Sequence, residues 1–364
     1  MLRPLRFCLS THLDFCTTFA YSARMDKNIS EITQTETLAS LGEFGLIGRI
    51  QERIKADPRV LFGIGDDCSV CTFPAGEVLL TTKDLLLEDI HFRREWTDMY
   101  SLGWKSAAVN LSDIAAMGGT ARYVHLGLGI PPDTSLTNLE QFTHGFLALC
   151  EQEGATLCGG DTCRSSHGLS ISVTVQGSAA QEEVCTRSGA QPGDVIYVSG
   201  TLGDSALALL QLMEGEKPLD EVILRHHRPE PRLKLGRALA QQHLVSAMID
   251  VSDGVFSDLG HILDCSKVGA ELDTRLIPLS KGAKTHVHLH PERRDQLLRG
   301  GEDYELLFTA PVYEQKRIDE VSTKLGLSLT PVGMILPEEK GFCYIDHSGT
   351  LQRTSAGGFN HFSS

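Results

Sequence analysis

The sequence IDVSDGVFSDLGHI, residues 249–262, runs from an apolar strand pattern at 248–251 into a short acidic turn. Asp250 and Asp253 stand in this turn, next to Gly254. Ligand sites of α/β proteins lie where buried strands end, because a rigid scaffold holds the loops there. Two carboxylates beside a buried strand repel each other unless a cation or a proton intervenes. The segment therefore predicts a mixed fold of strands and helices with a cation site at a strand end.

Further acidic motifs occur in both halves of the chain. They are GIGDD at 63–67, TTKD at 81–84, NLSD at 110–113, GGDT at 159–162 and GGEDY at 300–304. Glycine lets a backbone approach a phosphate closely, and aspartate supplies the hard oxygen ligands that suit Mg²⁺. Each aspartate taken singly also fits a helix cap or a turn. Their joint occurrence, with the pairs Asp66-Asp67 and Asp250/Asp253, favours a site for metal-bound phosphate.

The periodicity of apolar residues predicts an α/β or α+β architecture. Strand patterns occur at 78–82, 124–130, 169–175, 195–199, 248–251, 304–309 and 342–345. Helical patterns occur at 42–54 and 102–117, the second ending at Gly118-Gly119. In this second helix the apolar face leaves Asn110 and Asp113 on a different side. Residues 211–235 and 278–300 are expected to form loops or exposed helices.

The length of 364 residues favours two domains. The turn-rich segment RSGAQPG at 187–193 places their boundary near residue 180, which gives units 42–180 and 181–364. Residues 1–41 are expected to be a disordered extension or to follow from a start assigned too far upstream, because Met25 begins a polar stretch.

The composition excludes several classes of protein. A formal net charge of −14 argues against a nucleic-acid partner, because that binding needs basic residues to neutralise phosphates. There is no apolar run long enough for a membrane span. The 10 cysteines are scattered, which fits a reducing cytoplasm, and the Cys68/Cys71 pair has no partners that would complete a zinc site. P-loop, Rossmann, protein-kinase and GxSxG motifs are absent.

The motifs in their order along the chain resemble the thiamine-monophosphate kinase family. The resemblance rests on GEFGLIGRI at 42–50, GIGDDC at 63–68, AAVNLSDIAAMGG at 107–119, GGDT at 159–162, TRSGAQPGDVIYVSGTLGDSA at 186–206, HRPEPRLKLG at 227–236, IDVSDGVFSDLGHI at 249–262 and GGEDYELLFT at 300–309. It implies the two-domain aminoimidazole-ribonucleotide synthetase-like fold and a homodimer formed through the N-terminal domains. It also implies direct, in-line transfer of the ATP γ-phosphoryl group to thiamine monophosphate, assisted by several Mg²⁺ ions.

The resemblance also implies roles for particular residues. The Mg²⁺ ligands would be Asp67, Thr82, Asp84, Asp113, Asp161, Asp250 and Asp253, with the backbone carbonyl of Lys83 as a further candidate. The nucleotide would contact Gly160, Asp161, Arg187 and Ser252, and thiamine phosphate would contact His91, Glu302 and Phe359. The acceptor is itself an anionic phosphate, so the protein's task is positioning and charge neutralisation, with no residue needed as a general base.

Some of these positions have alternatives. Arg187 also fits an ion pair near the domain boundary, and His91 also fits a structural role. Phe359 could stack on the thiamine but offers no hydroxyl group. Lys83 replaces a small hydroxyl residue of the family, and its ammonium would compete with a metal only if it pointed inward. Asp89 replaces a glycine before His91.

Two other functions remain open at this point. The first is another ATP-using synthetase of the same superfamily, such as the purine enzyme, selenophosphate synthetase or the hydrogenase maturation factor. The maturation factor needs a C-terminal cysteine, whereas this chain ends NHFSS at 360–364. The second is a nucleotide-binding dimer module without catalytic activity, which would be expected to have lost several of the aspartates.

Overall fold

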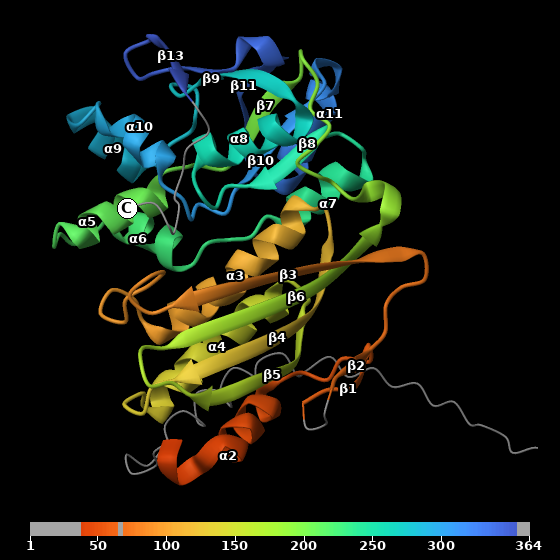
Figure 1. Ribbon diagram of the computed structural model, residues 1–364, viewed down its shortest axis with the longest axis vertical. Coiled ribbons are helices and arrows are strands. Elements are labelled where there is room, and N and C mark those ends of the chain that lie inside the picture. The colour runs from red at the N-terminus through yellow and green to blue at the C-terminus, as the bar shows by residue number, and fades with distance from the viewer. Residues whose placement is uncertain (1–37, 65–67, 355–364) are drawn as a thin grey trace, which may run out of the picture.

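The computed structural model of the protein describes residues 38–64 and 68–354 (Figure 1). Its first half contains α2 (Leu38–Arg53), β1 (Val60–Phe62), β2 (Val70–Cys71), β3 (Glu77–Leu87), α3 (Met99–Ala116), β4 (Thr120–Ile130), α4 (Leu136–Gln152), β5 (Thr156–Arg164), β6 (Ser170–Ala180) and the 3-10 turn η1 (Gln181–Glu183). Helix α2 is interrupted at Gly42, which has a φ angle of 70°.

The second half contains β7 (Val195–Ser199), α5 (Asp204–Met213), α6 (Asp220–His227), α7 (Leu233–Gln241), β8 (Ala247–Asp250), α8 (Val255–Ser266), β9 (Val268–Asp273), α9 (Lys281–Leu289), α10 (Arg293–Arg299), β10 (Leu306–Ala310), η2 (Val312–Glu314), α11 (Gln315–Leu325), β11 (Leu329–Pro337), η3 (Glu338–Lys340), β12 (Phe342–Ile345) and β13 (Leu351–Thr354).

A four-stranded sheet of order β3-β6-β4-β5 organises the first half. Strand β6 is antiparallel to both β3 and β4, and β5 is parallel to β4. Figure 1 shows α3 and α4 on one face of this sheet, while the other face is turned toward the viewer. Residues of β3 alternate accordingly, since Leu86 is buried whereas Leu85 is 55% exposed.

A seven-stranded sheet of order β13-β12-β9-β11-β7-β10-β8 organises the second half. Its central strands are apolar on both faces. Tyr197, Met248 and Phe308 join the core that continues into the first half, whereas their neighbours Ile249 and Leu307 join a second core. Because alternate residues point to opposite faces, a continuous apolar run is what a strand covered on both sides requires.

Helix α3 lies between the two sheets. It packs on α4 and β3 within the first half, and on α7 and β8 of the second. At Gly236 of α7, an added Cβ atom would come within 2.0 Å of the Ala115 carbonyl oxygen, so the two helices touch through their backbones. The helix is therefore buried nearly all round, including Asn110, which is 0% exposed. The sequence pattern predicted one buried apolar face on residues 102–117, but the structure buries nearly every side of this helix.

The mixed fold expected from the sequence is confirmed, and each predicted strand segment overlaps an observed strand. Two local expectations were wrong. The strand predicted at 78–82 continues to Leu87, so TTKD lies inside β3 and not at its end, and GGDT lies inside β5 rather than in a turn. The consecutive leucines hide the alternation in the second part of β3, and the paired glycines of β5 hide a strand that was not predicted. Within 38–64 and 68–354 there is no helix with the length and apolar character of a membrane span.

Close packing of α3 on α4 gives a test of the fold. At Gly103 an added Cβ atom would meet the Phe142 carbonyl oxygen at 2.0 Å, and neither backbone can easily move away. We expect Gly103→Ala to lower the free energy of unfolding by about 1–3 kcal/mol, although alanine favours helix more than glycine does. Urea denaturation followed by circular dichroism measures this change.

The matched control is Gly48→Ala in α2, where the new Cβ atom meets nothing within 4 Å. This control should keep the stability of the parent protein or raise it slightly. Equal stabilities for the two variants would contradict the backbone contact between α3 and α4.

Candidate active site

Helix α3 forms hydrogen bonds with two predicted metal ligands on β3, Thr82 and Asp84. The Thr82 hydroxyl donates a hydrogen bond to the Asp113 carboxylate. The Asn110 side-chain oxygen accepts a hydrogen bond from the Asp84 backbone N–H at 3.1 Å. Thr82 and Asp84 are two residues apart on a strand, so both side chains face the helix. The structure thus brings Thr82, Asp84 and Asp113 together.

Strand β8 places Asp250 against the same helix from the second sheet. Asp250 is 3% exposed, and its carboxylate accepts a hydrogen bond from the Ser112 hydroxyl at 2.7 Å. Neighbouring residues of α3, Ser112 and Asp113, therefore contact different halves of the molecule. The predicted carboxylates of the two halves converge around this turn of α3.

These carboxylates lie in an environment that opposes their ionisation. Burial raises the pKa of Asp84 to about 6, and the nearby charge of Asp113 adds to the effect. Burial and Asp113 together raise the pKa of Asp250 to about 7. The pKa of Asp113 is raised by burial, against the opposing effects of the Thr82 hydrogen bond and the Arg187 charge. Such a set of oxygen donors needs protons or cations when the site is dry.

Arg187 lies beside this group in a cleft of about 380 Å³. The cleft is lined by Leu79, Leu80, Thr81, Thr82, Asp113, Ile114, Ala116, Met117, Arg187, Met248, Ile249 and Asp250. The Arg187 charge lowers the pKa values of Asp113 and Asp250, so it lies within electrostatic reach of both. Within residues 38–64 and 68–354, Arg187 forms no ion pair, which leaves its guanidinium available to an anion.

Two loops complete the site on the side of the second sheet. The backbone N–H groups of Glu302 and Tyr304 donate to the carbonyl oxygens of Ser252 and Val251, at 2.8 and 2.9 Å. Glu302 and Tyr304 adopt left-handed φ angles of 66° and 51°, which are uncommon for residues other than glycine. The loops 250–254 and 300–305 therefore form one unit, which fixes Ser252 relative to Glu302.

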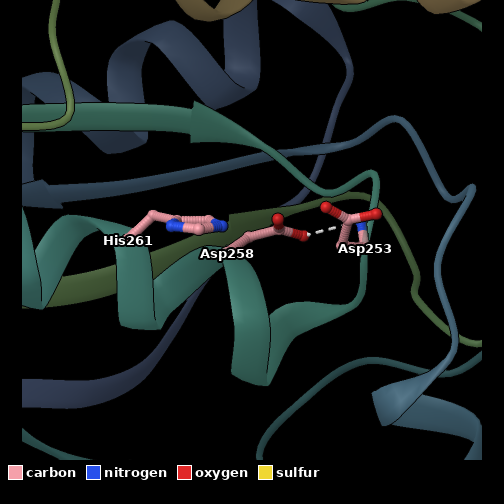
Figure 2. A group of neighbouring side chains, drawn as sticks. All are labelled: Asp253, Asp258 and His261. Atoms are coloured by element: carbon pink, nitrogen blue, oxygen red, sulfur yellow. Dashed lines mark hydrogen bonds between the residues drawn. The ribbon is translucent and has the colours of Figure 1, made fainter. Parts of the chain in front are cut away.

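Asp253 belongs to a further cluster with Asp258 and His261 of helix α8 (Figure 2). One ligand atom from each residue lies within 4.8 Å of the others. The Asp253 backbone N–H donates to the Asp258 carboxylate at 3.2 Å. Burial raises the pKa of Asp258 to about 8, and the charges of Asp250 and Asp253 add to this. Asp258 and His261 were not among the predicted ligands, although their separation of three residues would place them on one face of a helix.

Gly160 and Asp161 lie apart from this group. Gly160 pairs across the sheet with Leu126, then Val173, then Asp84, so it stands three strands from Asp84, roughly 14 Å away. Asp161 lies in the same cross-strand row as Leu85, so its side chain lies on the face of the sheet opposite to that of Asp84. Both residues line a larger cavity of about 760 Å³ with Phe44, His125 and Cys158. The structure does not bring Asp161 and Asp113 to one place in the protomer.

Lys83 and Asp89, which depart from the family pattern, can be placed in the structure. The Lys83 ammonium donates to the hydroxyls of Ser172 and Thr174, at 2.7 and 3.4 Å, on the outer face of the sheet, away from Asp84. Asp89 adopts a φ angle of 66°, a conformation that explains a glycine at this position. The His91 ring accepts a hydrogen bond from the Leu87 N–H through Nδ1 at 3.0 Å, which places any proton of the neutral ring on Nε2.

Asp67 and Phe359 lie outside the described residues. Cys71 ends the short strand β2 and is half-buried, Cys68 precedes this strand and is exposed, and both are free thiols.

The buried carboxylates predict an unusual pH dependence of stability. The folded protein holds a proton on Asp250 up to a pKa of about 7, whereas the unfolded chain releases it near 3.8. The unfolded state thus binds fewer protons in this window, and stability falls as pH rises from 4 to 7. We expect Asp250→Asn to stabilise the protein in EDTA, by about 1–3 kcal/mol more at pH 8 than at pH 5.

Urea denaturation at the two pH values measures this difference. Asp319→Asn on the exposed surface of α11 removes the same charge and should leave the pH dependence as it was. A loss of stability in Asp250→Asn at pH 8 would contradict the inferred cost of ionising Asp250.

Comparisons with known proteins identify the family of the chain. Residues 65–179 match the family model of the AIR synthase related protein N-terminal domain, and residues 191–346 match its C-terminal domain. The chain is 39% identical to thiamine-monophosphate kinase of Escherichia coli K12 over 328 residues, which cover 88% of this chain and 98% of the relative.

Two solved structures are similar over most of their length. The thiamine-monophosphate kinase of Stenotrophomonas maltophilia K279a has a TM-score of 0.74 and 39% identity, with 80% of this chain and 93% of the other covered. The structure described as "AaThiL complexed with AMPPCP and TMP" has a TM-score of 0.68 and 32% identity, with 91% and 100% covered. On these similarities, the chain belongs to the thiamine-monophosphate kinase family of AIR synthase related proteins.

Proposed function

We propose that the protein phosphorylates thiamine monophosphate to thiamine diphosphate with ATP as the co-substrate. A phosphate oxygen of thiamine monophosphate attacks the γ-phosphorus of ATP in line, the bond to the bridging oxygen breaks, and ADP leaves. The observation that carries the proposal is the cleft that Asp113, Asp250 and Arg187 line together. The family relatives, one of them described with AMPPCP and TMP, support the choice of substrates.

The donor set of the cleft fits Mg²⁺. Carboxylate and hydroxyl oxygens converge there, and hard oxygen donors are the ligands that Mg²⁺ prefers. Burial, with the nearby charge of Asp113, raises the pKa values of Asp84 and Asp250, and a bound cation would favour their ionised forms. Thr82, Asp84, Asp113, Asp250 and Asp253 would hold ions here, with Asp67 and the Lys83 carbonyl as further candidates. Asp161, on the other face of the sheet, would hold a separate ion.

When bound, Mg²⁺ would offset the negative charge that two phosphate-bearing substrates bring together. The side chains of the protein then have distinct tasks. Arg187 can donate two parallel hydrogen bonds to a transferring phosphoryl group. Gly160 and Ser252 are proposed nucleotide contacts, and His91, Glu302 and Phe359 are proposed contacts of thiamine phosphate. No general base is required, because the attacking oxygen already carries charge.

The phosphotransfer reaction is tested directly with purified protein, ATP and Mg²⁺, by offering thiamine phosphate and, separately, free thiamine. We expect one thiamine diphosphate and one ADP per turnover from thiamine phosphate alone. ADP without thiamine diphosphate would favour another synthetase of the superfamily, and no turnover would favour a nucleotide-binding module without catalysis.

The same assay tests the proposed metal ligands. Asp113→Asn and Asp253→Asn should each lower turnover by about 100-fold or more, because a neutral amide is a poorer Mg²⁺ ligand. Asp319→Asn on α11 is the control for the loss of one carboxylate and should retain the parent rate. Full activity in both active-site variants would show that the ligand assignment is wrong.

We also propose a homodimer that forms through the N-terminal unit, residues 42–180. The outer face of β3 carries Leu79, Leu85 and Leu87, which are 53%, 55% and 38% exposed. Several exposed leucines on one sheet face are typical of a protein interface. The division near residue 180 is part of this proposal, supported by the end of β6 at Ala180 and the start of β7 in the other sheet. A cytoplasmic location also remains a proposal.

Substitution on this face tests the dimer. We expect Leu85→Lys to shift the protein from dimer to monomer, because a buried and unpaired ammonium opposes association. Size-exclusion chromatography with light scattering gives the mass of each species. Val312→Lys, on an exposed apolar residue of η2, is the control and should remain dimeric. If the Leu85→Lys protein remains dimeric, the interface does not lie on the outer face of β3.

A further inference from the structure

Lys105 is a buried lysine in the middle of α3. The residue is 5% exposed, and lysine is rarely buried unless a partner compensates its charge. Its ammonium donates to the Glu302 carboxylate at 2.9 Å. The two side chains differ in exposure, at 6% for Lys105 and 29% for Glu302. The lysine thus holds the carboxylate from the protein interior, while part of the carboxylate faces solvent.

Lys105 and Ser112 face the second half of the molecule from the same side of α3. They are seven residues apart, which places them about 10 Å apart along the helix axis. Ser112 donates to Asp250 at 2.7 Å, and Lys105 donates to Glu302 at 2.9 Å. Because the loops that carry Asp250 and Glu302 are joined by backbone hydrogen bonds, α3 sets the position of the whole unit at two points.

Two histidines of α6 lie close to this ion pair. The His226 Nδ1 atom is 3.5 Å from the Glu302 carboxylate and 2.8 Å from the Ser205 hydroxyl. Burial lowers the pKa values of His226 and His227, and the Lys105 charge lowers them further. Both rings are therefore neutral near pH 7, and the positive charge that orients Glu302 comes from Lys105.

We propose that Lys105 is a positioning residue, which holds the Glu302 carboxylate in the orientation that binds thiamine phosphate. The inference rests on the proposed function, in which Glu302 contacts this substrate. Thiamine carries a positively charged thiazolium ring, and a carboxylate is its natural counter-charge. The left-handed backbone conformation of Glu302 sets the direction of its side chain, and the Lys105 ammonium holds its carboxylate. Loss of the ammonium would leave the carboxylate free to turn away from the substrate.

Steady-state kinetics at saturating ATP and Mg²⁺, with thiamine phosphate varied, test this role. We expect Lys105→Met to raise the KM for thiamine phosphate by about 10- to 100-fold and to change kcat by less than about threefold. Lys105→Arg keeps the charge and should recover most of the affinity. The double variant Lys105→Met/Glu302→Gln should be no worse than Glu302→Gln alone, because the lysine acts through the carboxylate.

Arg237→Met provides a matched control. Arg237 of α7 forms a 2.6 Å ion pair with Glu183 of η1, which involves neither Lys105 nor Glu302, and its loss should leave the KM for thiamine phosphate unchanged. Circular dichroism and the melting temperature report on folding. If Lys105→Met fails to fold, the neutral but polar Lys105→Gln variant replaces it with the same expected rise in KM.

The outcomes distinguish the positioning role of Lys105 from the proposed kinase activity. An unchanged KM in a folded Lys105→Met protein would overturn the positioning role while the kinase activity stands. A fall in kcat that adds to that of Glu302→Gln would also overturn it, because the lysine would then act on the phosphoryl group directly. A parent protein that makes no thiamine diphosphate would overturn the proposed function, and the role of Lys105 with it.

Discussion

The structure depends on the burial of one helix between two sheets. Helix α3 touches α4 through Gly103 and α7 through Gly236, contacts in which backbone meets backbone. Because α3 is enclosed on nearly every side, it has no solvent-exposed polar face. Three of its buried polar residues bond inside the protein: the Asn110 side-chain oxygen with the backbone of β3, Ser112 with Asp250, and Lys105 with Glu302. Among the described residues, the Asn110 side-chain nitrogen has no hydrogen-bond partner.

This arrangement explains why the carboxylates are close together despite their repulsion. Asp84 and Asp113 come from the first half and Asp250 from the second, and close helix packing brings them together. Burial and the charge of Asp113 raise the pKa values of Asp84 and Asp250, so their ionised forms lower the stability of the fold. Groups with strongly shifted pKa values gather at functional sites, which is consistent with the proposed role of these carboxylates.

Much of the fold and part of the site follow from the sequence. Strands such as β7 and β10 were predictable because apolar runs bounded by glycine or proline leave few alternatives. The GGDT segment was misplaced because a strand with two glycines lacks the β-branched residues that mark a strand. Asp84, Asp113 and Asp250 were found through their motifs. Lys105 and Asp258 were not, because the significance of each depends on a partner distant in sequence or on burial that no local pattern records.

The order of the motifs along the chain has a consequence for biosynthesis. Helix α3 is complete by Ala116, but the loop that carries Glu302 follows almost 200 residues later. At usual translation rates this interval lasts roughly 10–40 seconds. During that time the side of α3 that packs on α7 and β8 in the finished fold, including Lys105, has no partner from the second half. A chain that terminates before residue 302 would keep Lys105 without its carboxylate partner.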